Sequence, residues 1–315
     1  MNSHGPIPAV PVPVPAPMFV PVPVLVSGPV VVGVGRSAAG RGAVTWAADE
    51  AARTGRVLRL VHALKWPQTD PDEDTPRLLD DHVRVGGDIV LAQARTFVEE
   101  RHPGLETETR TVDGPRARGL LEQAADASLL VVGAKRRPVV EQVLTLPPIG
   151  VQLSAHAPCP VAVVRETADP AAHAPAPRPL VVVGVDGSPG SLAALELAFA
   201  QAAAHGAVLR VVRVCRDRPG RTAAAHTAAA GRCESRLLSA TAELRHRDPR
   251  VEVEHEVVFG RPVGALLGEA ARARCLVVGS RGLGGFRGLL LGSVSHALIE
   301  HAECPLIVVP PGKDY

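Results

Sequence analysis

The sequence predicts an α/β protein built from two tandem domains, each a doubly wound parallel sheet flanked by helices. The first observation is an internal repeat: residues 30–64 align without gaps onto residues 181–215, at an offset of 181 − 30 = 151. The second is that both copies alternate short β-branched runs, which indicate buried strands, with stretches of helical periodicity. Such sheets bind ligands beyond the carboxyl ends of their strands.

The repeat continues to the end of each copy and sets the domain boundaries. Residues 114–136 align onto 260–282, and residues 157–164 align onto 302–309 at an offset of 302 − 157 = 145. The offset drifts, so the changes in length fall in loops. We therefore divide the chain into a tail at 1–28, a first domain at 29–165, a linker at 166–179 and a second domain at 180–310.

The second copy shows the order of elements most clearly. Its first strand is a β-branched run at 180–185, and Ser188-Pro189 then combines a helix N-cap with a first-turn proline. Gly206 is placed to end that helix. The remaining elements are expected to be a strand at 208–214, a helix at about 222–246, an edge strand at 251–259, a helix after Pro262, a strand at 275–279, a helix from about 293 and a last strand at 306–309.

The composition excludes several classes of function. The 34 Lys and Arg residues nearly balance the 32 Asp and Glu residues, and aromatic residues make up 3% of the chain. Neither a long-range pull toward nucleic acid nor a base-stacking platform is therefore expected. No apolar run approaches the roughly 20 residues of a membrane span.

The five cysteines are scattered and contain no CxxC pair. We therefore expect no disulfide framework and no zinc ribbon, and a reduced, cytoplasmic location fits best. Cys159 and Cys304 occupy equivalent positions before the last strand of each copy, where buried and unreactive thiols are expected.

The tail at 1–28 alternates Val and Pro and lacks Lys and Arg, so it is neither a signal peptide nor a helix. An extended, polyproline-like conformation is expected. Three interpretations stay open: a ligand for a proline-recognising partner, a disordered extension, or an upstream start with Met18 as the true initiator. The linker at 166–179 is rich in Pro and Ala.

The most informative motif is a glycine-rich loop after the strand at 275–279. Gly279-Ser280-Arg281-Gly282 is followed by nine residues and then by Gly292-Ser293. The glycines permit close approach of a ligand, and the loop amides can form an anion-binding nest. Ser293 stands where the next helix begins, so the free amides there can face a phosphate.

Charged side chains complete the expected site. Asp186 follows the strand at 180–185, and its carboxylate can accept hydrogen bonds from a ribose hydroxyl or an adenine amino group. Arg281 and Arg287 can add positive charge. One glycine alone is better explained by a tight turn, but the whole spacing together with Asp186 indicates a nucleotide phosphate site.

The elements VGVDGS (183–188) and Gly279-x2-Gly282-x9-Gly292-Ser293 resemble the hallmarks of the universal stress protein family, here in tandem form. The resemblance covers both copies. It implies a Rossmann-like, five-stranded parallel sheet in each domain, and ATP binding, with or without Mg²⁺, in a stress or signalling role rather than a shared catalytic reaction. It further implies that Asp186 faces adenosine. The other residues it implies are Val185, Val214 and Val278 for the base and ribose, and Gly279, Gly282, Gly292, Ser293 and Val294 for the phosphates.

The same resemblance carries an expectation about assembly. Family members commonly dimerise through the last strand, so the strand at 161–164 is expected to pair with the strand at 306–309 within the chain. A homodimer is a further possibility of the same kind. No nucleic acid and no membrane are expected as partners.

The first copy departs from the glycine pattern. Gly35 aligns with Asp186, so the adenosine carboxylate is missing. Gly133 survives, but Arg136 replaces Gly282. We therefore expect that the first domain is a degenerate structural partner and that the second domain binds the nucleotide.

Prolines strengthen this interpretation. Gly292-Ser293 is replaced by Pro147-Pro148, or by Leu146-Pro147 if the gap is placed later, and proline has no N–H to offer a phosphate. The basic cluster at 135–137 is interpreted as a solvated charge run.

The first copy also contains a partial dinucleotide fingerprint. Gly33, Gly35 and Ala38 match the GxGxxA spacing between a strand and a helix. That fingerprint needs an acidic residue about 20 positions on, at the end of the second strand. Here the strand ends His62-Ala63-Leu64-Lys65, so NAD binding is not favoured.

Three functions compete: an ATP-binding module, a slow ATP hydrolase and a nucleotide-free dimerisation scaffold. A hydrolase needs a base near the terminal phosphate, and His296, one turn from Ser293, is the candidate. His296 and His301 are poorly spaced to share a zinc ion. No Walker-type phosphate loop occurs. We favour the ATP-binding module.

Overall fold

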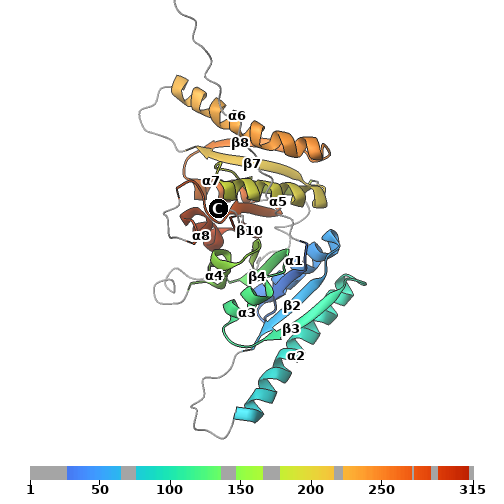
Figure 1. Cartoon of the computed structure of the whole chain (residues 1–315). Coiled ribbons are helices and arrows are strands. Elements are labelled where there is room, and N and C mark those ends of the chain that lie inside the picture. Colours follow the sequence, from blue (N-terminus) through green and yellow to red (C-terminus); the bar gives the residue numbers. More distant parts are fainter. Residues whose placement is uncertain are drawn as a thin grey trace, which may run out of the picture.

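One order of strands and helices runs twice along the chain (Figure 1). This computed structural model describes residues 27–64, 76–135, 147–165, 178–215, 223–271, 273–284 and 290–311. The expectations for the Val/Pro tail and for the linker concern residues that lie almost entirely outside these ranges, and they stay predictions.

The elements of the two domains correspond one to one. The first domain contains β1 (Val30–Gly33), α1 (Ala38–Thr54), β2 (Leu58–Ala63), α2 (Pro76–Arg101), β3 (Thr107–Val112), α3 (Arg116–Gln123), β4 (Leu129–Ala134), α4 (Ile149–His156) and β5 (Val161–Arg165). The second contains β6 (Leu180–Gly184), α5 (Pro189–His205), β7 (Val208–Cys215), α6 (Ala223–Arg247), β8 (Val253–Phe259), α7 (Pro262–Ala270), β9 (Cys275–Gly279), α8 (Ser293–His301) and β10 (Leu306–Val309).

Local sequence signals set the ends of the first helix in each domain. The Ser188 hydroxyl accepts a hydrogen bond from the Ser191 amide at 3.3 Å, and Pro189 begins α5, as predicted. Gly206 ends α5 with φ 56°, in the left-handed region that favours glycine. Ser37 and Gly55 do the same for α1. Equivalent caps therefore fix equivalent helices in both copies.

The described strands form one ten-stranded sheet in the order β3-β2-β1-β4-β5-β10-β9-β6-β7-β8. Within each domain all five strands are parallel. The predicted class, two tandem α/β domains with parallel sheets, is confirmed. The strand with alternating polarity, β8, lies at the edge of the sheet as predicted.

The two half-sheets meet where β5 pairs with β10 in antiparallel fashion. Ala162 lies opposite Ile307, and 307 − 162 = 145 is the repeat offset of this region. Equivalent residues of the two copies therefore face each other, as at the two-fold axis of a symmetric dimer. The contact extends beyond the sheet, because the Arg165 guanidinium donates to the Ile299 carbonyl at 2.6 Å.

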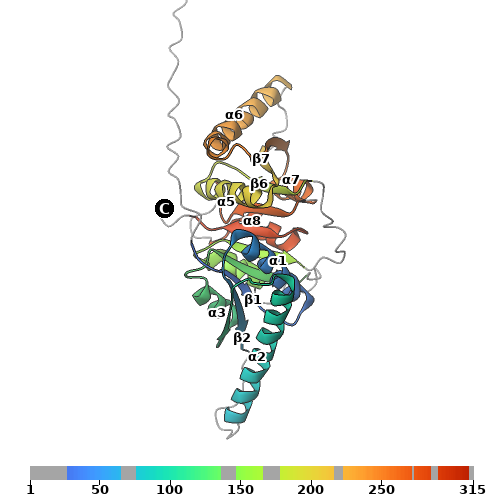
Figure 2. The ribbon, with the colours of Figure 1, turned by 90° about the vertical axis from the view of Figure 1, so that its right-hand side faces the viewer.

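Helices cover both faces of the sheet (Figures 1 and 2). Helices α1, α2, α5 and α6 pack on one face and α3, α4, α7 and α8 on the other, each layer over a core of aliphatic side chains that spans both domains. Parallel strands with both faces covered need this continuous apolar composition. No helix in the described ranges is both long and apolar enough to cross a bilayer.

A buried polar cluster joins α1 to α5 across the domain boundary. The Glu50 carboxylate accepts a hydrogen bond from the Gln201 amide at 2.6 Å and lies 3.0 Å from Nε2 of His205. The side chains of Glu50 and His205 are each 3% exposed. Since 201 − 50 = 151, Glu50 and Gln201 are equivalent residues of the repeat. The first copy therefore has a hydrogen-bond acceptor at this position and the second copy has a donor, so the two copies form a hydrogen bond with each other.

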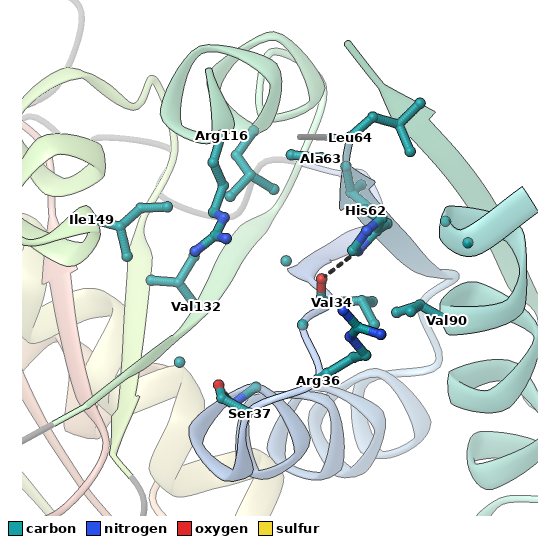
Figure 3. A pocket seen from close by; sticks show the side chains of 18 of the residues that line it. Val34, Arg36, Ser37, His62, Ala63, Leu64, Val90, Arg116, Val132 and Ile149 are labelled. Carbon is teal, nitrogen blue, oxygen red and sulfur yellow. Dashed lines mark hydrogen bonds between the residues drawn. The ribbon is translucent and has the colours of Figure 1, made fainter. Parts of the chain in front are cut away.

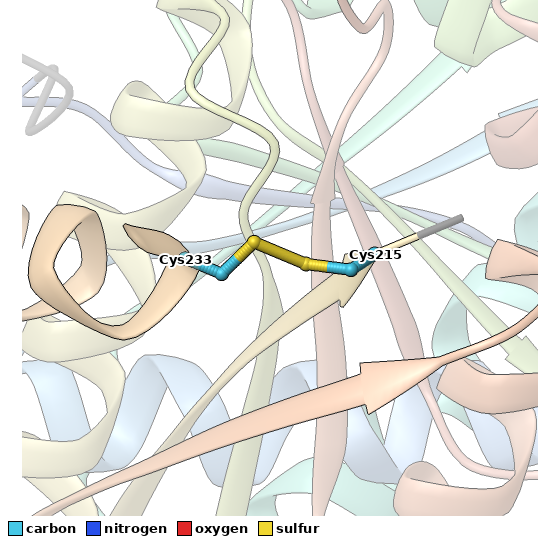
Figure 4. Close-up of a disulfide and its surroundings, with 2 residues drawn as sticks. All are labelled: Cys215 and Cys233. Atoms are coloured by element: carbon cyan, nitrogen blue, oxygen red, sulfur yellow. A yellow bond between two sulfur atoms is a disulfide. The ribbon is translucent and has the colours of Figure 1, made fainter. Parts of the chain in front are cut away.

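The cysteines require one correction. Cys215, at the end of β7, and Cys233, on α6, form a disulfide (Figure 4), although the scattered spacing led us to expect reduced thiols. The two cysteines are 18 residues apart, and only the packing of α6 against β7 brings them together. Cys159 and Cys304 are buried as predicted, and burial raises the pKa of each thiol to about 12, which keeps it unreactive.

A thiol titration tests this pairing. With five cysteines and one disulfide, the denatured oxidised protein should show 5 − 2 = 3 free thiols with a chromogenic disulfide reagent, and five after reduction. Cys233→Ser should leave four thiols without reduction. Five thiols in the unreduced protein would contradict the disulfide.

Candidate functional site

Asp186 ties together the loops that follow β6 and β9 in the second domain. Its Oδ1 accepts a hydrogen bond from the Ser188 amide at 2.9 Å, and its Oδ2 accepts one from the Leu283 amide at 2.8 Å. The carboxylate thus holds the glycine-rich loop against the start of α5. Each carboxylate oxygen keeps a further lone pair for another donor.

The carboxylate stays ionised although it is partly buried. Burial raises the pKa of Asp186, but hydrogen bonds from Ser188, Leu283 and Ser191 outweigh it, so this pKa lies below its ordinary 3.8. Arg213 on β7 adds a cation that sequence analysis missed: burial lowers the pKa of its guanidinium, and the charge of Asp186 partly restores it. The available signal was an arginine inside an apolar strand, directly before Val214.

Two glycines of the motif are required by close packing. A methyl group at Gly279 would lie 2.7 Å from the carbonyl carbon of Gly190, at the start of α5. A methyl group at Gly282 would collide with Oδ2 of Asp186. The equivalent Gly133 of the first domain packs in the same way against Ala39. A glycine at this position therefore serves helix–strand packing in both copies, and its presence does not by itself indicate phosphate binding.

The start of α8 is open to solvent and lacks a side-chain cap. Gly292 is its N-cap, with no side-chain hydrogen bond, and α8 begins at Ser293, where sequence analysis expected it. The Gly292 amide donates to the Ser280 carbonyl at 2.8 Å, which ties the helix start to the loop after β9. The first amides of a helix have no partner inside the helix. An anion near Ser293 would therefore meet free donors and the positive end of the helix.

The predicted apolar lining is divided between the two faces of the sheet. Val278 is buried in the core beneath α7 and α8, and Val214 and Val294 pack against it. Val185 is buried in the other core, beneath α5. Three of the four predicted valines therefore lie on the side of the glycine loop, whereas Val185 contributes its backbone position directly before Asp186.

The other polar residues predicted for the site lie on the glycine loop and on α8. Arg281 is exposed on the glycine loop, and Arg287 lies outside the described residues. His296 is half-exposed and lies 3.7 Å from Glu300 on the same helix. The hydroxyl of Ser280 is buried and has no hydrogen-bond partner in the part of the chain that the structure describes. None of these contacts brings a base toward the start of α8.

A cavity of about 450 Å³ lies at the equivalent place in the first domain (Figure 3). The carboxyl ends of β1, β2 and β4 form its floor, and α1, α2, α3 and α4 contribute to its walls. Its polar side chains are Arg36, Ser37, His62, His82 and Arg116. Nδ1 of His62 lies 2.9 Å from the Val34 carbonyl, which fixes the ring beside the loop after β1.

The first-domain cavity differs chemically from the predicted second-domain site. Gly35 stands where Asp186 would be, as the alignment indicated. The C-caps Ala157 and Ala302 match at 302 − 157 = 145, so Pro148 takes the place of Ser293, and α4 starts one residue later than α8. At the end of β2 the cavity is lined by His62, with no acidic residue where a dinucleotide ribose would need one.

Fold and site together define a duplicated, doubly wound α/β protein whose second copy carries a carboxylate and a glycine loop at the carboxyl edge of the sheet. The family model described as the universal stress protein family matches residues 27–165 and 179–310. The chain therefore belongs to the universal stress protein family, and it is a tandem member.

Full-length relatives have the same tandem organisation. Universal stress protein Rv2005c of Mycobacterium tuberculosis is 32% identical over 295 residues, which cover 89% of this chain and 96% of that protein. A universal stress protein of Mycolicibacterium smegmatis is 32% identical over 289 residues, covering 90% and 97% of the two chains. The crystal structure of a universal stress protein from Archaeoglobus fulgidus covers 93% of this chain and 100% of its own, with a TM-score of 0.67 at 17% identity, and it supports the fold.

Proposed function

We propose that the second domain binds an adenine nucleotide, ATP with or without Mg²⁺, and that the first domain is its structural pairing partner in a cytoplasmic stress or signalling role. The observation that carries the proposal is the uncapped start of α8 at Ser293, next to a glycine loop that Asp186 holds in place. This arrangement joins free amide donors for phosphates to a carboxylate for the sugar.

The chain's own residues suit a nucleotide that brings its metal with it. In the described ranges no group of three or more His, Cys, Asp or Glu side chains could hold a metal ion. Mg²⁺ would therefore enter with the phosphates, which is its usual mode of binding. Asp186 would receive the ribose hydroxyls on its remaining lone pairs, and Val214 and Val278 would line the pocket beside it.

The sharpest test transplants the first domain's proline into the second. Proline is favoured at the first helical position, and the extended backbone of Gly292 (φ −74°, ψ 152°) suits a residue before proline, so Ser293→Pro should fold normally. It removes one amide donor to a charged phosphate, worth about 1.5–3 kcal/mol. We expect Mg-ATP affinity, measured by isothermal titration calorimetry, to fall by about tenfold or more.

Ser293→Ala is the matched control, because it keeps the amide and removes only the hydroxyl. Its ATP affinity should stay closer to that of the wild type than to that of Ser293→Pro. A parallel titration with AMP shows how much binding depends on the outer phosphates. Equal ATP affinity in all three proteins would contradict the amide site, and no ATP affinity in the wild type would favour the nucleotide-free scaffold.

A further inference from the structure

The described residues that line the first-domain cavity include two arginines and two histidines. Arg36 and Arg116 bring permanently charged guanidinium groups, and His62 and His82 add imidazoles. No Asp or Glu is found among the described residues that line it. In Figure 3 the Arg116 side chain reaches toward Val132 and Ile149, whereas Arg36 lies beside His62 and Val90 on the other side. The two guanidinium groups therefore flank one space from different elements.

Among the described residues, neither guanidinium has a protein partner. In the described part of the chain, no hydrogen bond or ion pair of the Arg36 or Arg116 side chain is found. Other arginines of the same domain are paired: Arg59 with Glu108 and Asp126, and Arg118 with Glu122. The two cavity arginines thus differ from their neighbours in having their donors available.

The two arginines are specific to the first copy. Position 36 corresponds to 36 + 151 = 187, which is glycine, and position 116 corresponds to 116 + 146 = 262, which is proline. Position 35 corresponds to Asp186, and His62 corresponds to 62 + 151 = 213, which is arginine. Relative to the second copy, the first copy therefore loses one negative and one positive charge at this cleft and gains the two arginines. The second-domain site offers the Asp186 carboxylate as a hydrogen-bond acceptor for a sugar. The first-domain cleft offers the guanidinium groups of Arg36 and Arg116 as donors for an anion.

We propose that this cleft is a second binding site, selective for a phosphorylated small molecule rather than for an adenosine nucleotide. Arg36 and Arg116 bind the phosphate groups, for which the planar, multidentate guanidinium is well suited. The apolar lining, which includes Val61, Leu120 and Val132, accommodates the uncharged part of the molecule. The site is independent of the amides at the start of α8.

Inorganic pyrophosphate is the probe, titrated calorimetrically into the full chain. We expect the double variant Arg36→Ala/Arg116→Ala to bind it at least about tenfold more weakly than the wild type, because charge-assisted hydrogen bonds are lost. The matched control is Arg95→Ala/Arg118→Ala, which removes the same charge from exposed helix pairs outside the cavity and should bind as the wild type does. All variants should keep the wild-type melting temperature.

A second variant adds a charge instead of removing one. A methyl group at Gly35 would meet no atom within 4 Å, and its φ is not positive, so Gly35→Asp should fold. The new carboxylate should repel the probe and lower its affinity about tenfold or more, with a stronger effect at low salt. Adenosine in excess should not displace pyrophosphate from the wild type.

The outcomes separate this site from the proposed ATP site. Pyrophosphate binding that survives in Ser293→Pro but is lost in the double arginine variant supports the first-domain cleft, whatever happens to ATP. Binding that is lost in Ser293→Pro and kept in the arginine variant would place the probe in the second domain and overturn the inference. Absence of binding to the wild type, or displacement by adenosine, would also overturn it.

Discussion

Replacing Glu50 with alanine should lower the free energy of unfolding by about 3–5 kcal/mol, because it leaves buried partners without their acceptor. Glu50 is 2% exposed and accepts hydrogen bonds from Gln201 and His205 of the other domain. Carboxylate and amide oxygens only accept, so Nε2 of His205 must carry the proton. Urea unfolding should show a lower midpoint and, since the contact joins the domains, weaker coupling between their transitions.

The matched control is Glu99→Ala, which removes a carboxylate from an exposed pair with Arg95 on α2. Such pairs contribute about 0.3–0.5 kcal/mol, so this variant should unfold almost as the wild type does. Equal losses in the two variants would show that the buried cluster does not couple the domains.

The same cluster should make the protein sensitive to acid. Burial lowers the pKa of His205 below its ordinary 6.5. For Glu50, burial raises the pKa, but hydrogen bonds from His205 and Gln201 outweigh it and hold the pKa below 4.5. Both groups have a lower pKa in the folded protein than in the unfolded chain, so the unfolded chain takes up these protons at a higher pH. The free energy of unfolding therefore decreases as the pH is lowered, below about 6.5 for His205 and below about 4.5 for Glu50. Unfolding of Glu50→Ala should depend less on pH below 4.5 than unfolding of the wild type.

Replacing Gly279 with valine should destabilise the second domain by about 3 kcal/mol. Its side chain would begin 2.7 Å from the Gly190 carbonyl carbon and 3.0 Å from the Ser191 amide nitrogen, and both are backbone atoms that cannot turn away. Either α5 or β9 must shift. Because α5 begins with the Ser188 cap that also contacts Asp186, the proposed nucleotide site should be distorted as well.

Gly264→Ala on α7 provides the comparison. A methyl group there meets nothing within 4 Å, and alanine is favoured over glycine in a helix by about 0.5–1 kcal/mol, so this variant should be slightly more stable than the wild type. Thermal and urea unfolding should show a lower stability for Gly279→Val and a slightly higher stability for Gly264→Ala than for the wild type. A Gly279→Val protein as stable as the wild type would contradict the close packing of α5 on β9.

Much of the fold followed from local patterns. The repeat at 30–64 and 181–215 predicted two equivalent domains, and Ser188-Pro189 and Gly206 predicted the ends of α5, since caps depend on residues only a few positions apart. The start of α8 at Ser293 was predicted in the same way. Val185 was assigned to a pocket wall by resemblance; its side chain is buried beneath α5, and its role in a ligand site stays a prediction.

The sequence by itself determined the duplication, the order of strands and helices and the residues that gather at the carboxyl ends of β6 and β9. These follow from periodicity, caps and glycine spacing, which act over short distances. Only the tertiary structure decided that Glu50 meets Gln201 and His205, that Cys215 meets Cys233 and that Arg36 and Arg116 flank one cavity. Each of these contacts joins residues far apart along the chain, and no local pattern encodes the packing that brings them together.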